Sequence, residues 1–368
     1  LADTLDLHVA VAAVRLLPPR AVANMVEALE SDRAAELLRE LTPAEREGIL
    51  SLVSPDQASL LRTLLDWPDE SVAAHMVPEV LTVSDQVSAA EAIEQVRNHR
   101  AKLRQDSHIG AYVFAVDATN RLLGVVSFRE LVLADADRPV RDLVEEDVIT
   151  VGPLVDQEEA ARTLTKHRLL AIPVVDEDNH LLGVLTADDA SDIAEEEATE
   201  DAERQGGSEP LEVPYLRASP FLLWKKRIVW LLVLFLAAAY TGTVMQAFED
   251  ELEAVVVLAF FIPLLIGTGG NTGTQITTTL IRAMSIDNVR LRDVGKVLRK
   301  EMATGVMVAA AMAAAGLVRA WTLGVGVPVM ITVSVALVAI VLWSAFIASV
   351  IPLLLKKLRV DPAVVSGP

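Results

Sequence analysis

Residues 263–279 read PLLIGTGGNTGTQITTT and lie inside an uncharged run over residues 254–281. The run exceeds the roughly 20 residues that a helix needs to cross a bilayer. Its first half is apolar, whereas its second half combines four glycines with Asn271, Gln275 and several threonines. Irregular backbone is tolerated at membrane depth only inside protein or beside water. We therefore interpret the stretch as a polar pathway through a membrane. The alternative is a proline kink with close helix packing at Gly269–Gly273.

The composition separates an acidic half from an apolar half. Residues 1–220 hold 43 acidic and 19 basic side chains, whereas residues 221–368 hold 8 and 13. The mean hydropathy of +0.40 fits a chain that is partly embedded in a membrane. The negative first half argues against nucleic-acid binding and suits the attraction of cations. No cysteine is present, which excludes disulfides, thiolate metal sites and thiol nucleophiles.

Residues 1–78 have the pattern of a helical N-domain. Prolines or capping residues recur about every twelve positions, and each opens a short segment of apolar periodicity. Ser or Thr followed by Pro is typical of a helix start, because the side chain caps the helix and Pro is tolerated at its first position. We expect a short helical solenoid with a docking or regulatory role.

Residues 79–143 and 144–187 form an internal repeat. The segment FAVD at 114–117 matches PVVD at 173–176, and LLGVVS at 122–127 matches LLGVLT, 59 residues later in both cases. Each copy has the pattern of a helix, a buried strand, a turn, a second strand and a helix. The repeat resembles a tandem pair of CBS domains, a family whose clefts commonly bind adenine nucleotides.

The CBS resemblance implies a nucleotide motif of Ser or Thr followed three residues later by Asp. The second copy has Thr186 and Asp189 in these places, and the first has Ser127 and Glu130. A hydroxyl and a carboxylate at a helix start can hold a ribose, or they can simply cap the helix. Tyr112 is a candidate to stack on an adenine ring, with a buried core tyrosine as the alternative.

An acidic connecting helix and linker are expected over residues 188–220. Carboxylates recur there at helical spacing, at Asp189, Asp192, Glu196, Glu200 and Glu203. Like charges three or four residues apart on a helix repel each other, so we expect a cation or a basic partner to stabilise this helix. The alternative is an ordinary charged helix that is exposed to solvent. Mg2+ prefers oxygen ligands, often one or two carboxylates with retained waters.

Residues 221–368 are expected to form an all-α transmembrane bundle. Four apolar segments are long enough to span a bilayer, at Ile228–Phe248, Ala254–Ile281, Met302–Val318 and Pro328–Leu355. Basic residues cluster before the first, between the second and third, and after the fourth. The positive-inside rule therefore places the N-terminal domains in the cytoplasm of a multi-pass protein of the plasma (inner) membrane.

The chain resembles the MgtE family of magnesium transporters in the order of its parts. These are the helical N-domain, the CBS repeats, the acidic helix, the GTGGNTG stretch and the DPAVVSGP ending. The resemblance covers nearly the whole chain. It implies a multi-domain α and α/β membrane protein that assembles as a homodimer. It also implies a Mg2+-selective channel that closes when cytoplasmic Mg2+ binds, with ATP as a candidate ligand of the CBS cleft.

The resemblance also assigns roles to individual residues. Asn271, Thr274 and Thr278 would line the ion pathway. Regulatory Mg2+ sites between subunits and domains would draw on Glu158, Asp188, Asp189, Asp192, Glu197, Glu200 and Asp201. Some relatives carry Asn in place of Thr274 and Gly367, so ion selectivity or pore geometry can differ here. Arg168 stands where relatives have an acidic residue, which puts that sensor position in doubt.

A fifth span is expected beyond Pro368. No ionisable residue lies within the four spans except at their ends. Mg2+ gives up water reluctantly, and a divalent ion in a low dielectric needs negative charge as well as dipoles. The family resemblance implies a fifth helix that carries an Asp.

Two other functions remain open at this point. One is a broader divalent-cation channel that passes Mn2+ or Co2+. The other is a membrane-anchored CBS nucleotide sensor whose spans only anchor it in lipid. An enzyme is not expected, because no Ser-His-Asp set, cysteine nucleophile, phosphate-binding loop or His-rich metal centre can be assembled from the sequence.

Overall fold

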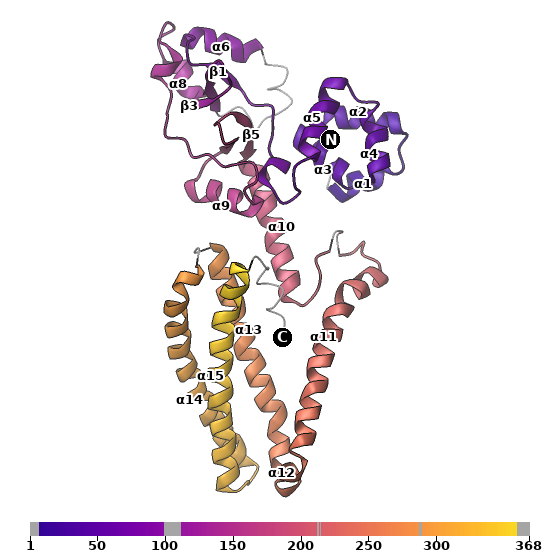
Figure 1. Cartoon of the computed structure of the whole chain (residues 1–368), viewed down its shortest axis with the longest axis vertical. Coiled ribbons are helices and arrows are strands. Elements are labelled where there is room, and N and C mark those ends of the chain that lie inside the picture. Colours follow the sequence, from indigo (N-terminus) through magenta and orange to yellow (C-terminus); the bar gives the residue numbers. More distant parts are fainter. Residues whose placement is uncertain (1–6, 99–111, 212, 214, 287–288, 359–368) are drawn as a thin grey trace. The chain divides into compact units, whose positions relative to one another are not determined.

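The computed structural model describes residues 7–98, 112–211, 213, 215–286 and 289–358. The chain divides into two compact units, Leu1–Glu197 and Ala198–Pro368. Figure 1 shows helices and small sheets in the first unit and long helices in the second. The expected combination of a helical N-domain, α/β repeats and an all-α bundle is confirmed.

The N-domain consists of short helices with their apolar faces turned inward. They are α1 (Leu7–Val14), α2 (Pro19–Ala28), α3 (Ser31–Arg39), α4 (Pro43–Leu50) and α5 (Pro55–Leu65). Proline occupies the first turn of α2, α4 and α5, as expected. At α4, Thr42 Oγ1 accepts from the Glu45 N–H, and the Glu45 carboxylate accepts from the Thr42 N–H at 3.0 Å. This capping box fixes where the helix begins.

Both repeats contain a helix, two strands and a second helix in that order, and the first repeat has an additional short strand before its first helix. The first contains β1 (Thr82–Ser84), α6 (Ala89–Asn98), β2 (Tyr112–Val116), β3 (Leu122–Ser127) and α8 (Phe128–Leu133). The second contains α9 (Gln157–His167), β4 (Ala171–Val175), β5 (Leu181–Thr186) and α10 (Ala187–Gln205). β1 pairs with β2 in parallel, and β2–β3 and β4–β5 are antiparallel hairpins. The short 3-10 helices are η1 (Val72–Ala74) and η3 (Val140–Asp142).

The turns of the two hairpins bond to each other reciprocally. Asn120 and Asn179 both adopt left-handed backbone conformations, with φ of 65° and 67°. Asn120 Nδ2 donates to the Leu181 carbonyl at 3.0 Å, and Asn179 Nδ2 donates to the Leu122 carbonyl at 2.7 Å. Asparagine tolerates this conformation better than most residues, which explains its presence at both turns.

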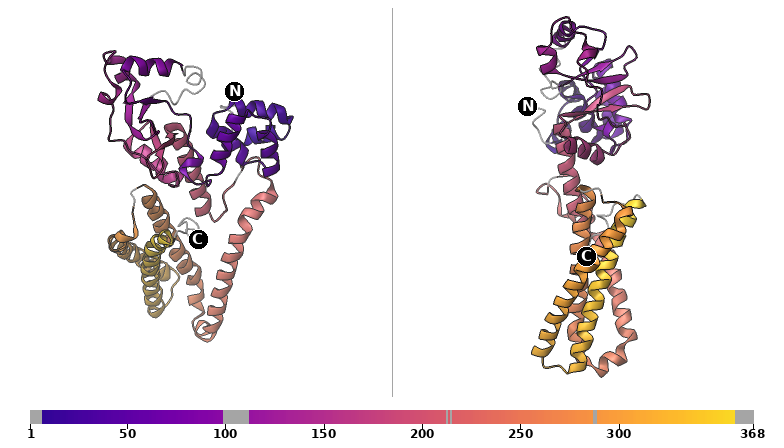
Figure 2. Two further views of the ribbon diagram at one scale, coloured as in Figure 1. Left: turned by 45° about the horizontal axis from the view of Figure 1, so that its top comes forward. Right: turned by 90° about the vertical axis from the view of Figure 1, so that its left-hand side faces the viewer.

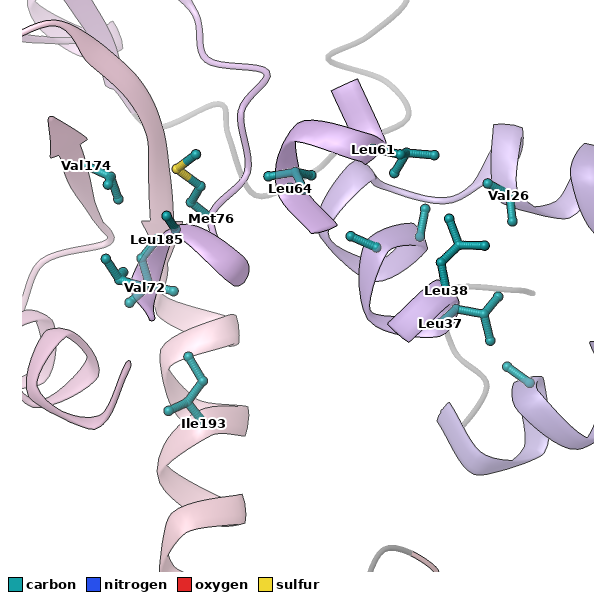
Figure 3. Close-up of a cluster of buried hydrophobic side chains, with 14 of the residues drawn as sticks. Val26, Leu37, Leu38, Leu61, Leu64, Val72, Met76, Val174, Leu185 and Ile193 are labelled. Carbon is teal, nitrogen blue, oxygen red and sulfur yellow. The ribbon is translucent and has the colours of Figure 1, made fainter. Parts of the chain in front are cut away.

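One hydrophobic cluster joins the N-domain to the second repeat. Figure 3 shows Leu37, Leu38, Leu61 and Leu64 of the N-domain in the same cluster as Val72, Met76, Val174, Leu185 and Ile193. All nine side chains are buried. Burial of this apolar surface stabilises the first unit and fixes α3 in relation to α10.

In the second unit, the described residues form four segments long and apolar enough to cross a membrane. They are built from α11 (Pro220–Ala247), η4 and α13 (Val256–Phe261 and Ile262–Ile286), η5 and α14 (Leu291–Asp293 and Val294–Thr322) and α15 (Val327–Lys357). A short helix, α12 (Glu249–Ala254), follows α11. Figures 1 and 2 show α13, α14 and α15 packed side by side, whereas α11 stands apart and has no buried residue.

Glycine permits the close packing of α15 against its neighbours. A Cβ on Gly269 of α13 would lie 2.7 Å from Ile340 Cγ2, and one on Gly305 of α14 would lie 3.2 Å from Ala345 Cβ. The helices can therefore approach closely at these points. The expectation of irregular backbone in the GTGGNTG stretch is wrong, because α13 runs through it as a continuous helix.

Candidate ion pathway and regulatory cation site

The three predicted pathway residues lie on one face of α13. Asn271, Thr274 and Thr278 are spaced by three and four residues, so they follow one another along the helix. All three are exposed within the single chain. Gly270 shares this face, and open space surrounds the position that its Cβ would occupy. The three residues thus form a polar face on a membrane helix, and their role in an ion pathway stays a prediction.

Other threonines of α13 satisfy their own hydroxyl groups. Thr268 Oγ1 donates to the Leu264 carbonyl at 2.7 Å, and Thr272 Oγ1 donates to the Thr268 carbonyl at 2.8 Å. Such bonds allow a hydroxyl to lie in an apolar bundle without an unsatisfied donor. Thr268 is buried, whereas Asn271, one turn further along the helix, is exposed. The polar groups of α13 are therefore divided between packing and the open face.

A second candidate site lies where α3 of the N-domain contacts α10. Arg33 Nη2 is 2.9 Å from Asp192 Oδ2, and Arg33 Nη1 is 4.0 Å from Glu36 Oε2. Asp32 is buried in this contact, with 7% of its surface exposed. Asp189 acts electrostatically on Asp32, Arg33 and Glu36. Carboxylates from both helices therefore meet with one guanidinium between them.

The carboxylates of this contact are held in an unfavourable environment. Burial raises the pKa of Asp32 well above its ordinary value, and the charge of Asp189 adds to the shift. Burial also raises the pKa of Glu36 to about 7, where Arg33 opposes the shift and the carboxylates of α10 reinforce it. The pKa of Asp189 is raised by burial and by Asp188, although the Thr186 hydroxyl lowers it. The contact holds more negative charge than its single arginine balances.

Asp32 Oδ1 is buried and has no hydrogen-bond partner in the described structure. A buried carboxylate oxygen without a partner is costly, and it indicates that the contact is incomplete without a further donor or cation. Within the described residues, however, no three His, Cys, Asp or Glu side chains of this single chain converge tightly enough to hold a metal ion.

Sequence reasoning missed Asp32 and Glu36. Their spacing of one helical turn beside Arg33 was a usable signal for a charged face on α3. That signal does not say which helix they meet, because Asp192, the partner of the neighbouring Arg33, lies 159 residues from that arginine in sequence.

The remaining predicted metal ligands are distributed along α9 and α10. Glu158 pairs with Arg162 at 2.5 Å, and Glu197 Oε1 accepts from Gln157 Nε2 at 2.8 Å. Glu200 pairs with Arg204 one turn further along α10. Asp188 and Asp201 are half-buried on the same helix. These residues do not form a single cluster, and their role as metal ligands stays a prediction.

The predicted nucleotide residues lie at equivalent places in the two repeats. Ser127 Oγ caps α8 by accepting from the Glu130 N–H at 3.2 Å. Thr186 Oγ1 donates to the Asp189 carboxylate at the start of α10. Tyr112 is half-buried at the start of β2. The structure thus shows the capping role, and nucleotide binding stays a prediction.

Two further positions were noted because relatives carry other residues there. Arg168 is exposed and forms the C-cap of α9 in a left-handed backbone conformation. Gly367 lies outside the described residues.

Comparison with known proteins decides the family. The MgtE family, described as a divalent cation transporter, matches residues 262–368. CBS domains match residues 71–137 and 140–195, and the MgtE intracellular N domain matches residues 2–70. The magnesium transporter MgtE of Thermus thermophilus is 35% identical over 338 residues, which cover 91% of this chain and 73% of that protein. The chain belongs to the MgtE family.

Other MgtE proteins give the same result. The magnesium transporter MgtE of Bacillus subtilis is 29% identical over 92% of this chain and 74% of its own length. Among solved structures, the soluble part of a magnesium transporter shares 33% identity and has a TM-score of 0.48. It covers 51% of this MgtE-family chain and 72% of the solved chain. The relatives that match most of the chain are thus named as transporters.

Proposed function

We propose that this chain is a Mg2+-selective channel or transporter of the plasma membrane, gated by cytoplasmic Mg2+. The observation that carries the proposal is the polar face of α13, with Asn271, Thr274 and Thr278 aligned on an exposed side of a membrane-spanning helix. Polar groups on a spanning helix are costly against lipid, so such a face belongs against water or protein. The MgtE relatives named as magnesium transporters support the same function.

The pathway would act on a hydrated ion. Amide and hydroxyl oxygens supply dipoles to a passing cation and to its water shell, but they carry no net charge. Because Mg2+ retains water strongly, ligands of this kind suit passage with most of the shell in place. One exposed face encloses no pathway, so the proposal requires a second surface opposite it. A second copy of the chain, in the expected homodimer, would supply that surface.

Mg2+ flux into liposomes tests this function. Asn271→Ala is expected to reduce flux at least tenfold, because it removes the amide from the polar face. Ile266→Ala is the matched control, since Ile266 is an exposed residue of the same helix on a different face. Equal flux in both variants would contradict the pathway assignment. Competing Mn2+ and Co2+ distinguish a Mg2+-selective protein from a broader divalent-cation channel.

The regulatory part of the proposal rests on the α3–α10 contact. Asp32, Glu36, Asp189 and Asp192 bring their carboxylates to one contact, and Asp32 Oδ1 lacks a partner there. A divalent cation would lower the repulsion between the two helices and offset the cost of burying the carboxylates. Ligands from a second subunit and from water would complete its coordination, consistent with the lack of a three-residue cluster among the residues that the structure describes.

The gating mechanism then follows from charge. Without Mg2+ the repulsion between carboxylates favours separation of the cytoplasmic domains. With Mg2+ bound they draw together, and α10 transmits the change toward the spans. Several weak sites acting together would give a steep response, since each shifts the equilibrium only by its differential affinity. Adenine nucleotide binding at the CBS cleft would modulate the same domains.

A further inference from the structure

Arg33 is the one basic side chain that the described structure places directly between α3 and α10. Its guanidinium is 2.9 Å from Asp192 of α10 and 4.0 Å from Glu36 of its own helix. The side chain is about one third exposed (36%), so its charge lies at the rim of the contact rather than in the core. A guanidinium here is always charged, because its pKa lies far above neutral pH.

Four carboxylates act on this one cation. Burial by itself would lower the pKa of Arg33, but Glu36, Asp192, Asp189 and Asp32 together raise it. An isolated exposed ion pair contributes little to stability, whereas a charge inside a network contributes more. The arginine therefore lowers the repulsion among all four carboxylates and not only within its pair with Asp192.

We propose that Arg33 is a built-in cation of the α3–α10 contact, which takes the place of a bound divalent ion when metal is scarce. This inference rests on the regulatory part of the proposed function. Both cations place positive charge between the same carboxylates. They differ in that the guanidinium is covalently attached, so its effective concentration does not depend on the metal in the cytoplasm.

The consequence is a contact that remains partly closed without metal. Arg33 supplies one positive charge against four carboxylates, which leaves a net deficit for Mg2+ to fill. Loss of the arginine charge should therefore open the contact only at low Mg2+, and saturating Mg2+ should close it again. A purely structural arginine would instead be required at every metal concentration.

The experiment measures the distance between the N-domain and the second repeat in the full chain. Because the chain has no cysteine, Gly48→Cys and Glu177→Cys provide two exposed and unique spin-label sites. Arg33→Met keeps an unbranched apolar side chain and removes the charge, whereas Arg33→Lys keeps the charge. Arg62→Met is the matched control, because Arg62 pairs with Glu47 within the N-domain. Labelled and unlabelled chains are mixed, so that distances within one chain dominate.

In metal-free buffer, Arg33→Met is expected to lower the ratio of docked to undocked molecules roughly fivefold. The reason is that it removes a charge that interacts with several carboxylates at once. Arg33→Lys and Arg62→Met should resemble the unsubstituted chain. At saturating Mg2+ all four proteins should be docked. If Arg33→Met is unchanged in metal-free buffer, or stays undocked at saturating Mg2+, the proposal is wrong.

The outcome is independent of transport. A chain that carries no Mg2+ in the liposome assay would overturn the proposed channel function and leave this distance measurement interpretable. Conversely, normal flux together with Arg33→Met that stays undocked in Mg2+ would overturn only the inference about Arg33.

Discussion

At the scale of single residues, Glu36 links the α3–α10 contact to pH. Its pKa is raised to about 7, chiefly by burial, from an ordinary value of 4.5. The folded protein therefore favours the protonated form. The stability that this proton contributes is fully present below pH 4.5 and is lost as the pH rises through about 7. Without metal, the contact should be tighter in mild acid than in mild base.

Glu36→Gln tests this pH dependence, because glutamine has the shape of the protonated acid and cannot lose a proton. In metal-free buffer the substituted chain should stay docked between pH 6 and 8, whereas the unsubstituted chain should undock as the pH rises. Spin-label distances across the same interval provide the measurement. Glu45→Gln, in the exposed capping box of α4, is a control on the same domain. An identical pH response in Glu36→Gln and the unsubstituted chain would argue against Glu36 as the titrating group.

Residue-level prediction from the sequence succeeded where the signal was local. The apolar run through Asn271, Thr274 and Thr278 could be assigned to a membrane span from its length and composition. Ser127 and Thr186 could be recognised as possible caps from their places at the start of an expected helix. The pairing of Asp32 and Glu36 with α10 could not be predicted, because helical periodicity gives the exposed face of a helix but not the partner it meets.

At the scale of helices, Gly316 fixes how closely α14 and α15 pack. A Cβ at Gly316 would clash with Leu337, which is fully buried. Gly316→Ala should therefore lower the melting temperature of the protein in detergent, with a cost of about 1–3 kcal/mol for overpacking. Gly242→Ala on α11 is the matched control, because nothing lies within 4 Å of its Cβ position.

The control also separates packing from helix propensity. Both substitutions replace glycine by alanine within a helix, so both gain the same intrinsic preference of about 1 kcal/mol. Only Gly316→Ala adds an atom to a filled space. Equal melting temperatures for the two variants would show that α14 and α15 can separate without loss of stability.

Helix existence was predictable from the sequence, but helix ends were less so. The four spans were expected from apolar length, yet α11 begins at Pro220, several residues before Ile228. Ser219 explains the difference, since its side chain accepts from the Leu222 N–H at 3.1 Å and caps the helix there. Apolar composition locates the part of a helix within lipid and says nothing about its polar extension.

At the scale of the whole molecule, Mg2+ should close the cytoplasmic domains and protect the connection that follows α10. Millimolar Mg2+ is expected to slow proteolysis of residues 206–211 several-fold in detergent. Replacement of Asp32, Glu36 and Asp189 by their amides should abolish this protection. The amides keep side-chain shape and remove charge, so the fold should survive.

A matched chain with Glu45→Gln and Glu47→Gln removes charge from an exposed helix of the N-domain and should keep the protection. Ca2+ at the same concentration tests whether charge alone is enough. Cleavage at equal rates with and without Mg2+ would rule out regulation through this contact.

The reciprocal bonds between the two hairpin turns bear on how such a chain arose. Asn120 and Asn179 each complete the turn of the other repeat, so neither repeat is self-sufficient at this edge. A single ancestral repeat would have found the same bonds only in a second identical molecule. Because both repeats lie in one chain, this pairing is intramolecular and does not depend on the concentration of the protein.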